Sequence, residues 1–247
     1  MKNKKKKSGK TFYAFVVDRS GSMGILTKET IDNFNEQINT LRALQKDFPD
    51  EKYFVTLCLF DHEIQTVYKD IPLDEVEHLN KDTYIPRGMT SLHDAIGITI
   101  SELRERQSKK LSKKKNSALV VVLTDGQENN SHEWKGEKVA NLIKEVDALD
   151  NWTISFIGAD KESALQATRD LGIVNTTFVN YSSSDSYQVT SSGIHNALYS
   201  RGFAKSRGVD LKTSLFDATM SDDGGLSSEL NMEKLEDIIE KEKKKKK

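Results

Sequence analysis

The sequence predicts an α/β protein: a doubly wound, mostly parallel sheet with one antiparallel edge strand and helices on both faces. Two observations lead to this fold class. Short apolar runs alternate along the chain with longer segments whose apolar residues have helical spacing, the order typical of parallel sheets. Most of these runs are continuous rather than alternating, as expected for strands buried on both faces. The 247 residues suffice for one large domain of this type.

Six runs of the sequence have the composition of strands. Five are short apolar runs at residues 12–17, 51–60, 117–123, 152–157 and 177–179. The run at 117–123 is the richest in β-branched residues and is therefore predicted to be the central strand. The sixth run, at 64–68, alternates apolar and polar side chains, which is typical of a half-exposed antiparallel edge strand.

The segments between these runs have the apolar spacing of helices. Helices are expected at about residues 25–48, 95–103, 139–146, 162–171 and 185–204, with a short acidic turn at 73–79. Pro49 ends the first helix, and Gly172 is a suitable C-terminal cap for the fourth. The lysines of residues 109–115 follow the second helix, where positive charge interacts favourably with the helix dipole. Because no aromatic residues are interleaved with them, we interpret this stretch as a solvated loop.

The net charge of −1 conceals a segregation of charge. Residues 1–10 contain six lysines and no acid, and residues 241–247 contain six lysines and one glutamate. The remaining sequence has 25 basic and 37 acidic residues, a net charge of −12. Such an acidic body argues against nucleic-acid binding by the folded body, which would need a basic patch on the fold itself. The tails could touch phosphate or anionic surfaces, but we expect them to be solvated ends.

We expect three parts along the chain. Residues 1–10 form a basic disordered tail, residues 11–204 form one folded domain, and residues 205–247 form a flexible C-terminal tail. Within this last part, Ser221–Gly225 is a flexible break, and residues 230–239 could form a short amphipathic helix before the final lysines. We interpret that helix as a docking or frayed tail helix, with a partner-binding helix as the alternative.

The sequence also favours one cellular compartment. The single cysteine, Cys58, lies within an apolar run and is interpreted as a small core residue rather than a nucleophile or disulfide partner. No apolar stretch is long enough to span a bilayer, and the lysine-rich start lacks the apolar region of a secretory signal. We therefore expect a soluble, cytoplasmic protein that does not contact a membrane.

The turn after the first strand presents three oxygen-bearing side chains. Asp18, Ser20 and Ser22 occupy every second position, so their oxygens can converge on one point. Gly21 between the serines allows close approach of the backbone. Oxygen donors without histidine or cysteine suit Mg²⁺ or Mn²⁺ rather than zinc. The simpler alternative is that Asp18 and the serines only cap the following helix.

Two later loops bring further oxygens to the same edge of the predicted sheet. Thr90 lies in a loop rich in turn residues, and Asp125 follows the predicted central strand within Thr124-Asp125-Gly126. Ligands of open α/β sheets bind beyond the carboxyl ends of the strands. Each residue has a simpler role as well: Thr90 could cap its helix, with Ser91 as the ligand instead, and Asp125 could belong to a turn. The joint placement of the three segments favours one divalent-metal site.

These residues resemble the metal-ion-dependent adhesion site (MIDAS) of the von Willebrand factor A (VWA) domain family. The family motif is Asp-x-Ser-x-Ser after the first strand, a threonine in a second loop and an aspartate after the central strand. It is matched by Asp18, Ser20, Ser22, Thr90 and Asp125. The resemblance covers about residues 11–204 and is greatest to stand-alone intracellular members from bacteria and phages.

The resemblance implies a docking function. The serine and threonine hydroxyls would bind Mg²⁺ or Mn²⁺ directly, while one or both aspartates often act through water. Because hydroxyls are neutral, the ion stays a Lewis acid with an open position, which an aspartate or glutamate of a partner protein would fill. The implied function is metal-mediated docking to a protein and not catalysis. Neither the partner nor the oligomeric state follows from the sequence.

Several other residues lie near the expected edge. Asp94 could hydrogen-bond a ligand, although a first-turn acid favoured by the helix dipole is the simpler interpretation. Arg87 lies on a loop and could contact an acidic partner. Asp61, His62 and His93 do not match the family motif, and His93 could gate access or be only a surface residue.

Two rival functions stay open at this point. A Mg²⁺-dependent phosphoryl hydrolase would use Asp18 as nucleophile, but such phosphatases need a second aspartate two residues later, where this chain has Ser20. A serine does not titrate usefully near neutral pH, which makes this alternative poor. The other rival is a metal-free scaffold that uses only its faces and tails. No phosphate-binding loop of the Gly-rich Lys-Ser/Thr type is present in the sequence.

Overall fold

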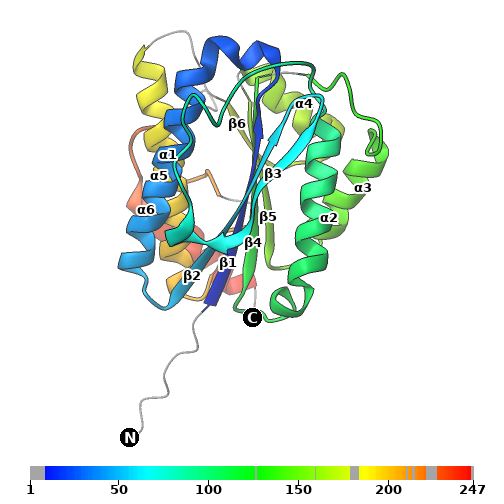
Figure 1. Cartoon of the computed structure of the whole chain (residues 1–247). Helices are drawn as coiled ribbons and strands as arrows, with labels where there is room; N and C mark the ends of the chain where they lie inside the picture. Colours follow the sequence, from blue (N-terminus) through cyan, green and yellow to red (C-terminus); the bar gives the residue numbers. More distant parts are fainter. Residues whose placement is uncertain are drawn as a thin grey trace, which may run out of the picture.

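The structure is a computed structural model that describes residues 9–125, 127–158, 160–178, 184–209, 211–212, 215–220 and 227–245. A six-stranded sheet in the order β3-β2-β1-β4-β5-β6 forms its centre (Figure 1). The strands are β1 (Gly9–Asp18), β2 (Glu51–Phe60), β3 (Ile64–Pro72), β4 (Ser117–Thr124), β5 (Trp152–Gly158) and β6 (Asn175–Phe178). Among these strands only β3, at one edge, pairs antiparallel. The predicted fold class is confirmed.

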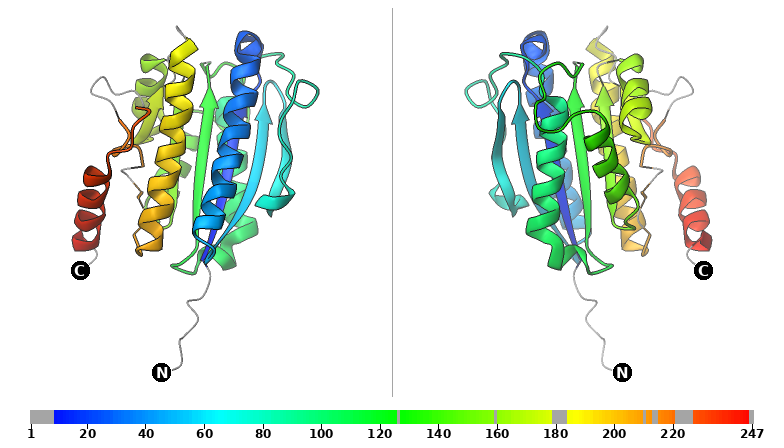
Figure 2. Two further views of the ribbon diagram at one scale, coloured as in Figure 1. Left: turned by 90° about the vertical axis from the view of Figure 1, so that its left-hand side faces the viewer. Right: turned by 90° about the vertical axis from the view of Figure 1, so that its right-hand side faces the viewer.

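Helices cover both faces of this sheet. They are α1 (Thr27–Asp47), α2 (Leu92–Leu111), α3 (Glu137–Asp147), α4 (Lys161–Leu171), α5 (Ser184–Ser206) and α6 (Met232–Lys245), with the short 3₁₀ helices η1 (Gly21–Leu26) and η2 (Leu73–Glu75). α1 and α5 lie on one face, and α2, α3 and α4 lie on the other (Figure 2). α6 packs beside the end of α5 through Leu235 and Ile239, which are both buried.

The strand sequences are continuously apolar because each face of the sheet has its own core. In β1, the odd-numbered residues from 13 to 17 pack with α1 and α5, and the even-numbered residues from 12 to 16 pack with α2 and α3. Every residue of β4, which lies beside β1 inside the sheet, is buried. A strand covered on both faces needs apolar side chains at every position, which is why no alternation is visible.

The ends of the domain differ from the predicted boundaries. β1 begins at Gly9, inside the expected N-terminal tail, because Gly9 and Lys10 pair with β2. Residues 1–8 and the predicted break Ser221–Gly225 lie outside the described residues. β6 covers Asn175–Phe178 instead of 177–179, and Val179 is not among the described residues. α6 begins later than the predicted 230–239 and continues to Lys245, and its buried Leu235 and Ile239 join a small core with the end of α5.

The edge strand β3 is longer than the predicted 64–68, and Asp70 anchors its second half. Asp70 has a positive φ of 51°. Its Oδ1 accepts a hydrogen bond from Thr56 Oγ1 (2.8 Å), and its Oδ2 accepts hydrogen bonds from Arg106 Nε (2.8 Å) and Gln107 Nε2 (2.7 Å). Burial raises the pKa of Asp70, but these hydrogen bonds outweigh burial and hold the pKa below its usual value.

We expect Asp70→Asn to lower the free energy of unfolding by about 1.5 kcal/mol at neutral pH, because hydrogen bonds to a charged acceptor are replaced by weaker ones. Asparagine tolerates the positive φ, so the backbone stays the same. Since the folded-state pKa is lowered, the contribution is fully present above the unfolded-state pKa of about 4 and is lost as pH falls through the folded-state pKa.

Urea unfolding of both proteins between pH 3 and pH 8 checks this expectation. The matched control is Glu102→Gln, which removes the exposed partner of the same Arg106 and should leave stability nearly unchanged. A difference between wild type and Asp70→Asn that stays constant down to pH 3 would contradict the assignment.

Candidate metal site

The topological switch point of the sheet lies between β1 and β4. The chain leaves β1 through α1 to pair with β2 on one side, and leaves β4 through α3 to pair with β5 on the other. Ligands of open α/β sheets bind at this position, beyond the carboxyl ends of the strands. Asp18 is the last residue of β1, and Asp125 directly follows β4, so both acidic residues lie at the switch point.

Asp18 is fully buried, and both of its carboxylate oxygens accept hydrogen bonds. Oδ1 accepts from the backbone N–H of Ser20 (2.7 Å), and Oδ2 accepts from the hydroxyl of Thr124 (2.5 Å). The Asp18 carbonyl oxygen accepts from the hydroxyl of Tyr84 (2.5 Å). Burial raises the pKa of Asp18 to about 6, although the hydrogen bonds from Thr124 and Ser20 oppose this shift.

The hydroxyls of Ser20 and Ser22 connect Asp18 with Asp125. Ser20 Oγ lies 3.2 Å from Ser22 Oγ, and Ser22 Oγ donates a hydrogen bond to Asp125 Oδ1 (2.9 Å). Burial raises the pKa of Asp125 as well, against the hydrogen bond from Ser22. Ser20 is buried whereas Ser22 is exposed. Two loops more than 100 residues apart thus bring together two carboxylates and two hydroxyls, and Ser22 is the exposed member of this group.

The loop that contains Thr90 lies against the first turn through backbone hydrogen bonds. The Gly21 N–H donates to the Gly88 carbonyl (3.1 Å), and the Arg87 N–H donates to the Arg19 carbonyl (2.8 Å). A Cβ atom at Gly21 would lie only 3.3 Å from that Gly88 oxygen, so a glycine suits this close approach. Thr90 is buried, and no hydrogen bond joins its hydroxyl to another described residue. Its hydroxyl is therefore available to a ligand.

Asp94 ties the loop after β4 to the first turn of α2. Its carboxylate accepts backbone hydrogen bonds from His132 (2.8 Å), Glu133 (3.0 Å) and Trp134 (2.6 Å). An acid in the first turn of a helix is also favoured by the helix dipole, as the simpler interpretation of the sequence expected. The structure makes Asp94 an anchor of residues 132–134.

Glu128 and Asn129, which were not predicted from the sequence, bind the backbone of the Thr90 loop and of the start of α2. Glu128 accepts hydrogen bonds from the backbone N–H groups of His93 (2.8 Å) and Ser131 (2.6 Å). Burial raises its pKa, but these hydrogen bonds hold it below the usual value. Asn129 Oδ1 accepts from the Thr90 N–H (2.9 Å), and the Asn129 N–H donates to the Thr90 carbonyl (3.1 Å). The polar residues 127–131 were the feature of the sequence that could have indicated this contact between the Thr90 loop and the loop after β4.

Two other residues considered near the site have partners within the protein. The Ser91 hydroxyl accepts a hydrogen bond from Asn130 Nδ2 (2.9 Å). Of the two hydroxyls, that of Thr90 therefore has fewer hydrogen bonds to described residues. The half-exposed Arg87 side chain pairs with Asp61 (3.0 Å) and Glu63 (2.5 Å). Gly126, the third residue of Thr124-Asp125-Gly126, lies outside the described residues.

Asp61, His62 and Glu63 form a second cluster of potential metal ligands, with ligand atoms within 4.8 Å of one another. Asp61 is fully buried, and its carboxylate lies 2.8 Å from Arg19 Nε and 3.0 Å from Arg87 Nε. Two guanidinium groups already balance this carboxylate, and they would repel a cation. The chemistry of this cluster therefore favours an internal ion-pair network over a metal site.

The donor set at the switch point fits a hard divalent cation. Two partly or fully buried carboxylates with raised pKa values lie near each other, and burial without a cation disfavours their ionised forms. The hydroxyls of Ser20, Ser22 and Thr90 add neutral oxygen donors, which suit Mg²⁺ or Mn²⁺. Side-chain contacts join Asp18, Ser20, Ser22 and Asp125, and backbone contacts bring the Thr90 loop beside them.

The sequence profile of the von Willebrand factor type A domain matches residues 14–192, well over half of the chain. A comparison with curated proteins gives no match. The solved structures give matches at low sequence identity. The PilB minor pilin from Streptococcus sanguinis is 14% identical, with a TM-score of 0.50, over 78% of this chain and 62% of that chain.

Two further similar structures contain a metal according to their descriptions. Manganese-loaded TRAP protein of Plasmodium vivax is 18% identical, with a TM-score of 0.45, over 70% of this chain and 69% of that chain. Proximal thread matrix protein 1 from the mussel byssus, with a zinc-occupied MIDAS motif, is 18% identical, with a TM-score of 0.43, over 69% and 41%. The chain spans less than half the length of several solved proteins that it resembles. Within the described residues, no helix has the length and apolar character needed to cross a membrane.

Proposed function

Because the chain belongs to the von Willebrand factor type A domain family, whose domains mediate metal-dependent protein interactions, we propose that it docks a partner protein through a divalent ion at its switch point. Asp18, Ser20, Ser22, Thr90 and Asp125 would hold Mg²⁺ or Mn²⁺. The partner would contribute an aspartate or glutamate carboxylate.

The observation that supports this proposal most strongly is the contact chain from Asp18 to Asp125. It runs through Ser20 and the exposed Ser22 and ends at the half-buried Asp125. When bound, Mg²⁺ would supply a Lewis acid that accepts one more carboxylate oxygen. The protein's own contribution is to orient the oxygens: Thr124 fixes the Asp18 carboxylate, and Asn129 fixes the Thr90 backbone.

The chemistry of Asp18 favours docking over phosphoryl transfer. A nucleophilic aspartate must reach a phosphorus atom, whereas Asp18 is fully buried and both of its oxygens accept hydrogen bonds. The residue two positions later is Ser20, which cannot serve as the acid or base of such a reaction. We therefore propose a binding module and not an enzyme. The buried, single Cys58 supports a reducing, cytoplasmic setting, and a bacterial or phage origin belongs to the same proposal.

The test is capture of the partner by the tagged full chain from a lysate of its source cell, with Mg²⁺ and with EDTA. The variant is Asp18→Ala. The matched control is Asp160→Asn, which alters a carboxylate after β5 at the same edge but outside the site. Asparagine replaces aspartate well as the N-cap of α4.

We expect wild type and Asp160→Asn to retain the partner in Mg²⁺ and release it in EDTA, and Asp18→Ala to retain none. A partner that stays bound to Asp18→Ala, or that EDTA does not release, would contradict metal-mediated docking and favour the metal-free scaffold.

A further inference from the structure

A cavity of about 490 Å³ lies beside the candidate metal site, between β3 and the segment that leads from η2 to the Thr90 loop. Figure 1 shows this segment returning along the sheet to the edge that carries the site. Arg19 and Arg87 line the cavity and belong to the loops of the site as well. Arg19 directly follows Asp18, and the Arg87 N–H donates to the Arg19 carbonyl (2.8 Å). We call this space the β3 cavity; it begins next to the first candidate ligand.

A bulge in β3 places the side chain of Val67 at this cavity. In the pairing of β2 with β3, Cys58 lies opposite Thr66 and Leu57 lies opposite Tyr68, so Val67 has no partner residue on β2. An extra residue of this kind bends a strand and redirects its side chains. Consecutive residues of a regular strand point to opposite faces, yet Val67 and Tyr68 both line the β3 cavity.

Exposed apolar side chains are concentrated around the site and the β3 cavity. Eight large apolar residues of the described chain are exposed, and four of them belong to this region: Ile25, Val67, Ile85 and Met89. Val67 and Ile85 line the cavity. Ile25 follows Ser22 by three residues, a full turn of a 3₁₀ helix, so both lie on one face of η1. Apolar residues that are grouped at a surface are typical of a protein contact.

The charges of the β3 cavity do not favour an anionic ligand. Its two arginines already have acidic partners, because Arg19 pairs with Asp61 (2.8 Å) and Arg87 pairs with Asp61 (3.0 Å) and Glu63 (2.5 Å). The lining also includes the exposed carboxylates of residues 77 and 82, which would repel another carboxylate. The side chains left to contact a ligand in this lining are therefore the exposed apolar ones.

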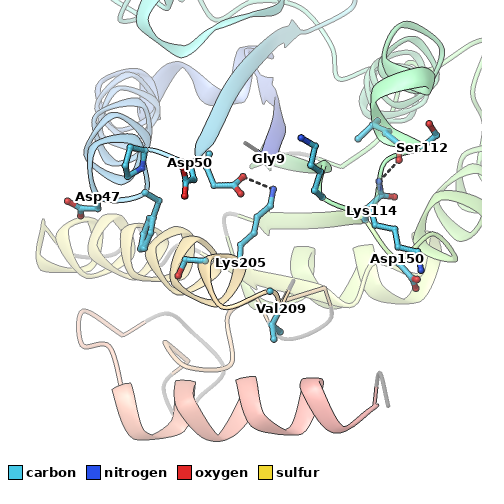
Figure 3. Close-up of a pocket in the computed structure, with 16 residues that line it drawn as sticks. Gly9, Asp47, Asp50, Ser112, Lys114, Asp150, Lys205 and Val209 are labelled. Atoms are coloured by element: carbon cyan, nitrogen blue, oxygen red, sulfur yellow. Dashed lines mark hydrogen bonds and ion pairs between the residues drawn. The ribbon is translucent and has the colours of Figure 1, made fainter. Parts of the chain in front are cut away.

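A larger cavity, of about 980 Å³, lies too far from the site to receive a neighbouring residue of the same partner. Gly9 and Lys205 line it (Figure 3), and Gly9 is the first residue of β1, whereas Asp18 is the last. The ten residues of β1 separate the two ends by about 30 Å. Lys205 is moreover paired with Glu51 (3.1 Å). Of these two cavities, only the β3 cavity is within reach of a partner residue close to a metal-bound carboxylate.

We propose that the β3 cavity receives an aliphatic side chain of the partner protein, from a residue close in sequence to the aspartate or glutamate that binds the ion. This inference rests on the metal-mediated docking proposed above. The ion fixes the partner's carboxylate, and the cavity selects among acidic partners by the neighbouring side chain. Contact of that side chain with Val67 and Ile85 removes apolar surface from water, which is favourable.

The first experiment selects displayed peptides on the full-length protein. Each library peptide has a fixed central aspartate with random positions on either side, binds in Mg²⁺ and is released with EDTA. We expect leucine, isoleucine, methionine or valine to be enriched at one position on one side of the aspartate. Peptides recovered without this preference, or with lysine or arginine there instead, would overturn the proposal but leave metal-mediated docking intact. Recovery of no peptide would contradict both.

The second experiment compares the best selected peptide with the same peptide carrying serine in place of the aliphatic residue. Wild type should bind the aliphatic peptide about tenfold more tightly, as for partial burial of such a side chain. The double variant Val67→Gln, Ile85→Gln should reduce this preference to about twofold or less. The matched control is Leu165→Gln, Val174→Gln, which makes the same kind of change at exposed apolar residues outside this region and should keep the full preference.

Calorimetric titration with Mn²⁺ separates this proposal from the metal site itself. The double variant Val67→Gln, Ile85→Gln changes none of the candidate ligands, so it should bind the ion as wild type does. Three outcomes would overturn the proposal. The first is an unchanged preference for the aliphatic peptide in this variant, and the second is an equal loss of preference in the control variant. The third is loss of Mn²⁺ binding by the variant, which would assign its weaker peptide binding to the metal site.

Discussion

Replacement of Asp18 by alanine is expected to abolish the stabilisation that Mg²⁺ or Mn²⁺ gives to the wild-type protein. A ligand that binds only the folded state at 100 times its dissociation constant stabilises it by about 2.7 kcal/mol. Asp18 is the one residue of the site that is connected to both β4, through Thr124, and the first turn, through Ser20. Without its carboxylate, the remaining charged donor at the site is Asp125.

Thermal unfolding with and without added metal measures this effect. Asp18→Asn is the second variant, because it keeps the shape of the side chain and hence the fold while removing the charge. Asp160→Asn is the control and should respond to metal as the wild type does. A melting temperature that rises equally with metal in wild type and in Asp18→Asn would contradict the assigned role of Asp18.

The second large effect is expected for Asp61→Ala, which should lower the free energy of unfolding by about 3–5 kcal/mol. Arg19 is nearly buried, with 8% of its side chain exposed, and its ion pair with the fully buried Asp61 balances its charge. Gln65 Oε1 accepts a hydrogen bond from Arg19 Nη1 (2.6 Å), but it is a neutral group. Removal of Asp61 therefore leaves a buried positive charge without compensation.

Chemical denaturation of Asp61→Ala against Glu63→Ala checks this expectation. Glu63 pairs with the same Arg87 as Asp61 does, but at an exposed position, so its removal should change stability little. Equal stability of Asp61→Ala and Glu63→Ala would contradict the claim that the buried ion pair of Arg19 and Asp61 holds the β2–β3 turn beside the site.

Much of the fold could be predicted because strands that are buried on both faces of a sheet are continuously apolar, and such runs can be recognised in the sequence. The run at 117–123 was predicted to be the central strand, and β4 is buried at every residue inside the sheet. The second half of β3 could not be predicted, because it depends on Asp70 meeting Arg106 and Gln107. Those partners lie in α2, more than 30 residues away, and a local pattern contains no information about them.

The candidate site likewise contains residues that the sequence predicted and residues that it did not. Asp18, Ser20, Ser22 and Asp125 form a spaced motif, and the structure joins them by hydrogen bonds at one sheet edge. The contact of Glu128 with the start of α2 was not predicted, because Glu128 accepts there from the backbone N–H of His93, a group that every residue except proline has.

The most direct measurement is isothermal titration of the metal-free full chain with Mn²⁺ and with Mg²⁺. If the loops after β1 and β4 and the Thr90 loop hold one ion, the wild type should bind one ion per chain. Thr90→Ala should then bind more weakly, and Asp18→Ala should give no heat of binding. Absence of binding by the wild type, or equal binding by Asp18→Ala, would contradict the account.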